Sequence, residues 1–495
     1  MAAQPALDST PGGNASPTRA RGTRTILAIV LLGLVLRALL ALAAGTPELQ
    51  SDEANYTYLA LSWNHLGFYG DSYRYLWPPG YPFLLAKAID LFGMQGFEAI
   101  KLLQILASGV IGAATMLLAR QLFGQRAALG AGLAWCLYLP LAAFTHLFWT
   151  EPLFLALFLP ALLCLLRAAR LPERSNAPLL LAGLLLGLSL YLREVVLFLI
   201  PALALWVGWG IRGGLSAAMA TPAEGLRRAS LLLLAAAVVI FPWTLRNHEV
   251  YGRWLVVGSS MGENAYLGLN EGYKNFDLTP YARQLPAGAQ DPMDEVRPFF
   301  AASHLDQVGT HWERAEDIKN VPDRLAENAA RGRAWALAHP LDFARTRIKK
   351  LADFVAPLSF FLRHQALDRY PGPLGSPALR RPLVIWALLC PLAALLAGLW
   401  GGITVLSPGP PRRLFALVAL YFLATSTLVS MSRFRLPLMP LALVLGAGLI
   451  WGHRPAAHSP SARRRAAALV ATALLLFLWW VDLPEVLAVL ELALA

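Results

Sequence analysis

Charged residues are scarce in this chain of 495 residues, where they make up 15% of the sequence against 57% for hydrophobic residues. A soluble protein of this length needs far more charge to cover its surface, so the composition excludes an ordinary soluble domain. Apolar runs near the ~20 residues that cross a bilayer recur along almost the whole sequence. The sequence therefore predicts an all-α, polytopic membrane protein.

Cysteine is also rare, and Cys136, Cys164 and Cys390 all lie within apolar runs. An odd number of such thiols forms neither a disulfide framework nor a metal site, so we expect them to be packing residues. No GxGxxG, Walker or HExxH motif occurs in a suitable context, which excludes the common nucleotide and zinc sites. The net charge of +12 is explained by basic residues in membrane loops, and no nucleic-acid partner is predicted.

The amino-terminal region predicts a tail and a membrane anchor. Residues 1–24 are rich in Ala, Pro, Gly, Ser and Thr, which indicates a disordered cytoplasmic tail. The run 25–44 ends in ALAAG, so a cleaved signal peptide is the alternative to a first span. The run is longer than a signal core of ~7–15 residues and contains Arg37, which favours an uncleaved anchor. About 11 spans are predicted in all, the others at about 98–120, 127–145, 152–169, 178–192, 195–211, 229–245, 382–402, 414–430, 436–452 and 466–483.

Basic residues predict the orientation of these spans. With a cytoplasmic amino terminus, every short cytoplasmic loop carries arginine, as the positive-inside rule requires. We therefore expect a multi-pass protein of the plasma (inner) membrane. The predicted parts are an N-terminal transmembrane catalytic module at 25–246, an outer-face loop region with amphipathic helices at 247–380, and C-terminal transmembrane helices at 381–495.

Two adjacent acids, Asp52 and Glu53, follow the first span in the sequence SDEANY. Ser51 or Asp52 could cap a helix, and Glu53 would favour the helix dipole, which is an interpretation without function. A carboxylate at the membrane surface is alternatively a general base that takes the proton of an acceptor hydroxyl. The position directly after a span favours this second interpretation.

Other charged and aromatic residues fall in the predicted outer loops. Trp77 and Tyr81, in WPPGYPFLLA, suit a membrane interface as anchors or as part of a binding surface. Glu151 precedes Pro152 at the start of a span, a pattern that also caps helices. Arg193 is followed by an acid and could pair with it or with a partner charge, and ionisable groups at membrane depth are functional candidates.

Arginines form the third candidate group. Arg246, in FPWTLRNHEVYG, and Arg433 and Arg435, in MSRFRLPLMP, each follow a span that ends at the predicted outer face. A guanidinium binds phosphate in a planar, bidentate way, although an arginine at a span end also snorkels to lipid headgroups. The positive-inside bias makes snorkelling less natural at this face. The sequence does not distinguish between Arg433 and Arg435.

Taken together, SDEANYTYLALSWNHLGFYG, WPPGYPFLLA, FPWTLRNHEVYGRWLVVGSSMGENAYLGLN and SRFRLPLMP resemble the polyprenyl-phosphate-sugar-dependent glycosyltransferases of the GT-C fold. The bacterial branch related to protein O-mannosyltransferases and lipid A aminoarabinose transferases is the most similar. The resemblance implies that Asp52 is the catalytic carboxylate, with Glu53 beside it, and that Glu151 is a second acidic position. In the aminoarabinose transferases a lysine precedes the double proline, where this chain has Trp77. Phosphate binding is then expected at Arg74, Arg246 or the pair Arg433 and Arg435.

The resemblance implies a membrane glycosyltransferase with its active site on the extracytoplasmic face. Its partners would be a polyprenyl-phosphate-linked sugar, a lipid, glycan or protein acceptor, and membrane lipids. Direct displacement with inversion needs no cofactor, and the sequence leaves a divalent metal open. The alternative function is a transporter or flippase of lipid-linked saccharides, which would use similar charges without breaking a bond.

Overall fold

The computed structural model describes residues 17–45, 49, 52–66, 69, 77–171, 175–210, 222–258, 321–452 and 460–494. Within these ranges the protein is helical and has no strand, which confirms the predicted all-α class. The α-helices are α1 (Pro17–Ala44), α2 (Asp52–Leu66), α3 (Gly80–Phe92), α4 (Gly96–Phe123), α5 (Gln125–Leu137), α6 (Leu139–Ala142), α7 (Glu151–Arg170), α8 (Asn176–Leu190), α9 (Leu199–Leu205), α10 (Pro222–Tyr251), α13 (Val321–Ala338), α14 (Pro340–Val355), α15 (Phe360–Ala366), α16 (Pro377–Trp400), α17 (Pro410–Ser426), α18 (Met439–Trp451) and α19 (Ala462–Leu494).

Seven helical segments of the described chain are long and apolar enough to cross a membrane, or eight if one bent pair counts as a span. In that pair, α5 meets Leu139–Thr145 at an angle of 60°. The chain is thus a multi-pass membrane protein, but the predicted count of about 11 spans is not confirmed. Two predicted spans, 178–192 and 195–211, coincide with apolar helices that are shorter than a span, Asn176–Leu190 and Glu194–Gly208.

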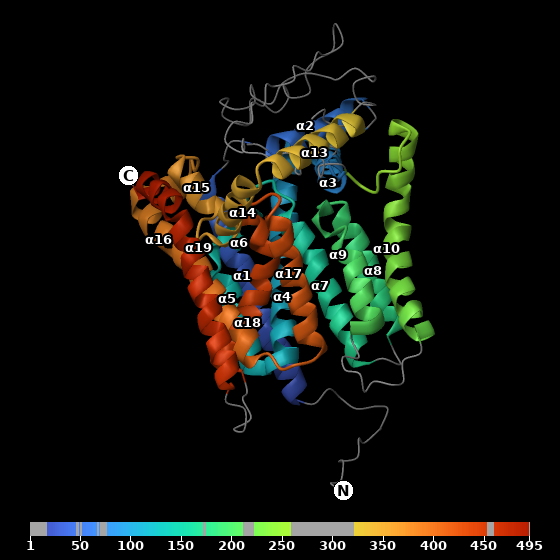
Figure 1. The fold of residues 1–495 in the computed structure, drawn as a ribbon. Helices are drawn as coiled ribbons and strands as arrows, with labels where there is room; N and C mark the ends of the chain where they lie inside the picture. The colour runs from blue at the N-terminus through green and yellow to red at the C-terminus, as the bar shows by residue number, and fades with distance from the viewer. Residues whose placement is uncertain are drawn as a thin grey trace.

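The helices form a bundle around α4 (Figure 1). This helix packs against α1, α5, α7 and α18, so segments from both halves of the sequence share one hydrophobic core. By contrast, only 17% of the most apolar stretch of α1 is buried, and the same holds for α19. Their exposed leucines and tryptophans therefore face the lipid, where apolar surface has no cost.

Arg37 interrupts the apolar run of α1 without disturbing it. The guanidinium donates to the carbonyls of Gly33 and Trp135, each at 3.1 Å, and lies 3.9 Å from the centroid of the Trp135 ring. Gly33 is required here, because a Cβ at this position would come within 2.1 Å of the indole. Two of its three nitrogens thus have partners inside the bundle, as a charged residue at membrane depth requires. Helix α1 already begins at Pro17, so residues 17–24 of the predicted tail are helical.

Basic residues and candidate site residues lie at opposite ends of the bundle. Arg170, at the last residue of α7, donates to the carbonyl of Gln121 near the end of α4 at 2.7 Å. Gly22, near the start of α1, lies beside Arg120. Glu151 begins α7 and therefore lies at the other end, where α2, α3 and α13 are found (Figure 1). The predicted segregation of charge is thus present in the fold.

Amphipathic helices are predicted within the outer-face region 247–380. Residues 321–355 form two of them, α13 and α14, whereas 259–320 lie outside the described residues. Helix α14 buries Ala352, Phe354 and Val355, and packs against α17, α19 and the short helix Ser432–Leu438. This short helix carries two of the candidate arginines, so α14 supports the candidate site.

Candidate active site

The two acids that follow α1 occupy the first turn of α2 and are both buried. Glu53 accepts a hydrogen bond from the backbone amide of Phe148 at 2.7 Å, so its carboxylate fixes the turn that leads into α7. Such a buried carboxylate needs a donor, because an unsatisfied acceptor costs about 1–3 kcal/mol. Glu53 therefore positions the site, while its neighbour Asp52 points to a different partner.

Asp52 forms an ion pair with Arg433. Asp52 Oδ2 and Arg433 Nη1 are 2.8 Å apart, and the two side chains are only 12% and 11% exposed. The arginine comes from the short helix Ser432–Leu438, so the pair joins the first outer segment to the C-terminal half of the bundle. The guanidinium thus holds the Asp52 carboxylate in a fixed position at the start of α2.

Aromatic rings surround the guanidinium of Arg433. Its central carbon lies 4.3 Å from the ring centroid of Trp149, 5.2 Å from that of Phe434 and 5.6 Å from that of Phe360. Such rings attract a cation and exclude water, which strengthens every charge interaction nearby. The site is therefore a place where an arginine can act on a second anion with little competition from solvent.

A second ion pair lies beside the first. Glu151, the first residue of α7, pairs with Arg193, which precedes the short helix Glu194–Val196. Arg193 also donates to the hydroxyl of Thr150 at 3.3 Å. The ring of Phe434 is near both arginines, 5.6 Å from Arg193 and 5.2 Å from Arg433. The two pairs thus belong to one polar site with a shared aromatic wall.

Tyr56 is buried within the electrostatic influence of both pairs and did not stand out in the sequence. Burial raises the pKa of its phenol well above the usual range, and the charges of Asp52 and Glu151 add to this effect. Arg433 and Arg193 oppose the increase, which places the hydroxyl within the field of both pairs. Tyr56 therefore remains a neutral hydrogen-bonding group at physiological pH. One signal was available, since it lies one helical turn after Asp52 and shares its face of α2.

Trp77 and Tyr81 support this tyrosine. Their rings lie 5.2 and 5.1 Å from that of Tyr56, centroid to centroid. The Tyr81 hydroxyl donates to Gln104 at 3.0 Å, and the amide of Gln104 donates to the carbonyl of Leu147 at 2.7 Å. The segment WPPGYP thus supports the polar site through Gln104, which holds the turn at Leu147 and Phe148 that also binds Glu53.

Several buried donors near Arg433 have no hydrogen-bond partner within the described part of the chain. They are the Nε of Arg433, the indole nitrogen of Trp149 and the hydroxyl of Ser432. A small cavity lined by Ser432, Arg433 and Phe360 adjoins them, with room for about one water molecule. Unused donors around an arginine favour an anion such as a phosphate oxygen.

Arg435 and Arg246 do not join this group. Arg435 is 1% exposed and donates to the backbone carbonyls of Phe354, Ala356 and Leu358. It therefore fastens the chain after α14, and of the pair predicted for phosphate only Arg433 faces Asp52. Arg246 lies 4.8 Å from the Trp243 ring and donates to the carbonyl of Tyr69 at 3.2 Å. Arg74 lies outside the described residues.

Comparison with known proteins bears on the reaction class. Residues 77–243 match the family model described as dolichyl-phosphate-mannose-protein mannosyltransferase, which is about a third of the chain. The match confirms the resemblance over that segment. It includes Tyr81, Glu151 and Arg193, and it ends before Arg433. None of the curated proteins matches the chain in sequence.

Two solved structures resemble the fold. The oligosaccharyltransferase of Archaeoglobus fulgidus in its apo form has 14% identity and a TM-score of 0.47, with 96% of this chain and 56% of that chain covered. ArnT from Cupriavidus metallidurans, bound to undecaprenyl phosphate, has 16% identity and a TM-score of 0.36, with 87% and 78% covered. The present chain thus spans little more than half the length of the oligosaccharyltransferase. Likenesses at this level carry no information about the substrate.

Proposed function

We propose that this protein is a membrane glycosyltransferase that moves a sugar from a polyprenyl-phosphate carrier to an acceptor hydroxyl. The pairing of Asp52 with Arg433 at 2.8 Å carries the proposal. A base for the acceptor and a cation for the departing phosphate must both reach one anomeric carbon, and this pair supplies the two together. The family match over residues 77–243 supports the reaction class, because its description names a polyprenyl-phosphate sugar.

The proposed chemistry is a single displacement. Asp52 takes the proton of the acceptor hydroxyl, and that oxygen attacks the anomeric carbon. The bond from this carbon to the phosphate oxygen breaks, its electron pair passes to the phosphate, and the configuration inverts. Arg433 stabilises the charge that develops on the polyprenyl phosphate, where a preorganised cation contributes most. No metal enters these steps.

Arg433 has two anionic partners in this scheme. In the free protein it holds Asp52, whereas the donor phosphate would draw the guanidinium to itself and leave the carboxylate to the acceptor hydroxyl. The second pair, Glu151 with Arg193, is proposed to bind hydroxyls of the sugar, with Tyr56, under the electrostatic influence of both pairs, as a neutral donor. The polyprenyl tail would lie among the helices that surround this end of the bundle.

We further propose that this end of the bundle is the extracytoplasmic side of the plasma membrane. The arginine-rich loops at the other end support this orientation, since basic loops remain in the cytoplasm. The acceptor hydroxyl then belongs to an envelope lipid, glycan or protein.

Replacement of Asp52 by Asn tests the proposal. We expect sugar transfer from a polyprenyl-phosphate donor to fall by about 10²–10⁴, because the base is lost, while donor binding persists. Glu98→Gln serves as the control, because Glu98 is an exposed acid on α4 that pairs with Lys101 at 2.7 Å. If Asp52→Asn retains the rate of the control, or if purified protein moves the intact lipid-linked sugar across vesicles without releasing polyprenyl phosphate, the proposal is wrong.

A further inference from the structure

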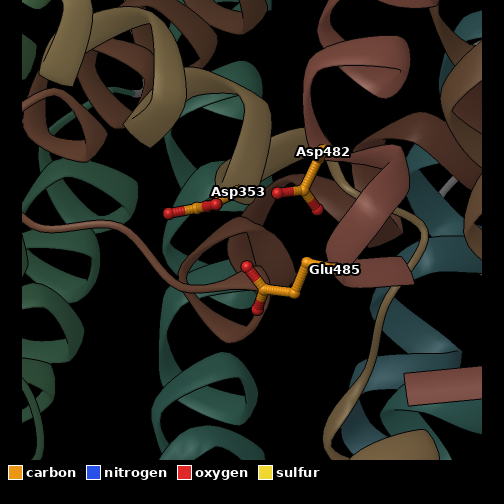
Figure 2. A group of neighbouring side chains, drawn as sticks. All are labelled: Asp353, Asp482 and Glu485. Atoms are coloured by element: carbon orange, nitrogen blue, oxygen red, sulfur yellow. The ribbon is translucent and has the colours of Figure 1, made fainter. Parts of the chain in front are cut away.

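A second cluster of acids lies where α14 meets α19, apart from the candidate active site. Asp353 is near the end of α14, while Asp482 and Glu485 are one turn apart on α19 and share one face. Figure 2 shows the three carboxylates turned toward a common centre. One oxygen from each lies within 4.8 Å of the others. Their contacts identify the kind of ligand that suits this centre.

The acids of the cluster share their cationic partners. Lys349 Nζ lies 3.6 Å from an oxygen of Asp353, 3.6 Å from one of Asp482 and 3.7 Å from one of Glu485. Arg363 adds a contact with Glu485 at 3.1 Å. Within 4 Å the three carboxylates thus contact two cations, and Lys350 acts on Asp353 from further away. The Lys349 ammonium is shared among all three acids beyond hydrogen-bonding distance.

Asp482 provides an observation independent of the clustering. Its side chain is 1% exposed, and neither carboxylate oxygen has an N–H or hydroxyl donor within hydrogen-bonding distance among the residues that the structure describes. A buried carboxylate without donors is costly, and the shared ammonium at 3.6 Å does not satisfy it. Figure 2 shows one of its oxygens turned toward Asp353 and Glu485. A cation that accepts a lone pair from this oxygen would remove the cost.

We propose that Asp353, Asp482 and Glu485 bind a divalent cation of the calcium type. The three ligands are all carboxylates, which suit a hard cation such as Ca²⁺ better than zinc, whose structural sites are built mainly from Cys and His. Two oxygens on opposite sides of Ca²⁺ are about 4.6–5.2 Å apart, which accommodates the separations in this cluster. Lys349 is 46% exposed and Glu485 is 41% exposed, so the ammonium can move into solvent and water can complete the coordination.

A cation here would fasten the amphipathic helix to a membrane-spanning one. Trp479 of α19 already donates its indole N–H to the carbonyl of Val355, at the last residue of α14, at 2.8 Å. The next carbonyls along the chain, including that of Ala356, hold Arg435. The site therefore lies on the segment that supports the arginine-bearing helix Ser432–Leu438, and its occupancy should stabilise the fold irrespective of any transfer reaction.

Calcium titration of the full-length protein in detergent tests this site. After treatment with a chelator, addition of CaCl₂ should raise the thermal unfolding midpoint by roughly 2 °C or more at saturation. Glu485→Gln should weaken the apparent affinity about tenfold or more, because one ligand charge is removed. Asp482→Asn should abolish the shift.

Asp342→Asn is the matched control. Asp342 lies on the same helix α14, is 49% exposed and pairs only locally with Arg345 at 3.2 Å. This variant should keep the full response to CaCl₂. The inference is overturned if CaCl₂ leaves the wild-type midpoint unchanged, or if Glu485→Gln responds at the same concentrations as the wild type. Glu485 is partly exposed, so Glu485→Gln keeps the test decisive even if Asp482→Asn does not fold.

Discussion

Two clusters of acids, the candidate active site and the junction of α14 and α19, are balanced in different ways. In the candidate active site Asp52 pairs with Arg433, Glu151 pairs with Arg193, and Glu53 accepts from the backbone amide of Phe148. At the junction of α14 and α19 three carboxylates share the ammonium of Lys349 at 3.6–3.7 Å. The acids of the first cluster thus each have a close partner, whereas those of the second share one ammonium at a longer distance.

This difference indicates which ligand each cluster accepts. A matched pair admits an anion only if that anion displaces the carboxylate from its guanidinium, and arginine is well suited to exchange between carboxylate and phosphate. A cluster whose acids share one ammonium at a longer distance instead gains from a cation that contacts all of them. The same residue types thus predict a phosphate-bearing substrate in one place and a metal ion in the other.

The strongest test of this contrast removes the cation of the first cluster. Arg433→Gln should reduce transfer about 10²–10³-fold, because the departing phosphate loses its preorganised donor. The effect should not add to that of Asp52→Asn, since the two residues act as one unit. The measurement is the release of polyprenyl phosphate from a sugar-linked donor. A rate above half that of the wild type would show that phosphate is bound elsewhere.

Arg435→Gln is the companion variant to Arg433→Gln. Its guanidinium is used by the backbone carbonyls after α14, so we expect a loss of thermal stability without a selective loss of turnover in the protein that folds. If Arg435→Gln instead folds as the wild type and loses transfer, the roles of the two arginines are the reverse of those assigned.

The pair Glu151 and Arg193 is expected to contribute mainly to the free energy of unfolding. Arg193 is only 16% exposed, and Glu151→Gln removes its counter-charge. Breaking a buried pair from one side costs about 3–5 kcal/mol, and we expect a value near the lower end because Arg193 retains Thr150. Denaturant unfolding in detergent measures the change. The double variant Glu151→Gln, Arg193→Met should recover part of the loss, and a double variant as unstable as the sum of the two singles would contradict the pairing.

Asp52→Asn should also tighten the binding of polyprenyl phosphate. If the carboxylate and the phosphate compete for Arg433, removal of the carboxylate charge frees the guanidinium. An increase in affinity of about tenfold corresponds to ~1.4 kcal/mol, a reasonable value for a partly buried pair. Titration with undecaprenyl phosphate measures it. An unchanged or weaker affinity would mean that Asp52 and phosphate do not share Arg433.

Sequence patterns predicted the apolar helices, the segregation of charge and the helix starts at Asp52 and Glu151, because hydropathy and capping are local properties. They did not separate Arg433 from Arg435, since the choice depends on carbonyls after α14 that only the fold brings near. They did not single out Tyr56 among the aromatic residues of α2, because its relation to the two ion pairs depends on the fold.

Local sequence patterns also failed to predict the number of spans and the cluster of Asp353, Asp482 and Glu485. The predicted spans 178–192 and 195–211 are as apolar as true spans, but the helices there are too short. Asp353 and Asp482 lie on different helices, and no motif links them in the sequence. Their approach follows from the packing of α14 against α19, a tertiary contact that hydropathy does not encode.

The smallest expected effect sharpens the contrast most. Lys349→Met keeps the apolar stem and removes the shared ammonium, so without calcium it should cost only about 0–1 kcal/mol, because Lys349 is 46% exposed. With calcium bound, Lys349→Met should instead stabilise the protein, because the ammonium that competes with calcium is gone. The calcium-induced shift of the unfolding midpoint should therefore exceed that of the wild type. Arg433→Gln, by contrast, should leave the calcium response at the wild-type level, because Glu53 and Glu151 keep partners of their own in the candidate active site. A smaller calcium shift in Lys349→Met would mean that the ammonium belongs to the site and does not compete for it.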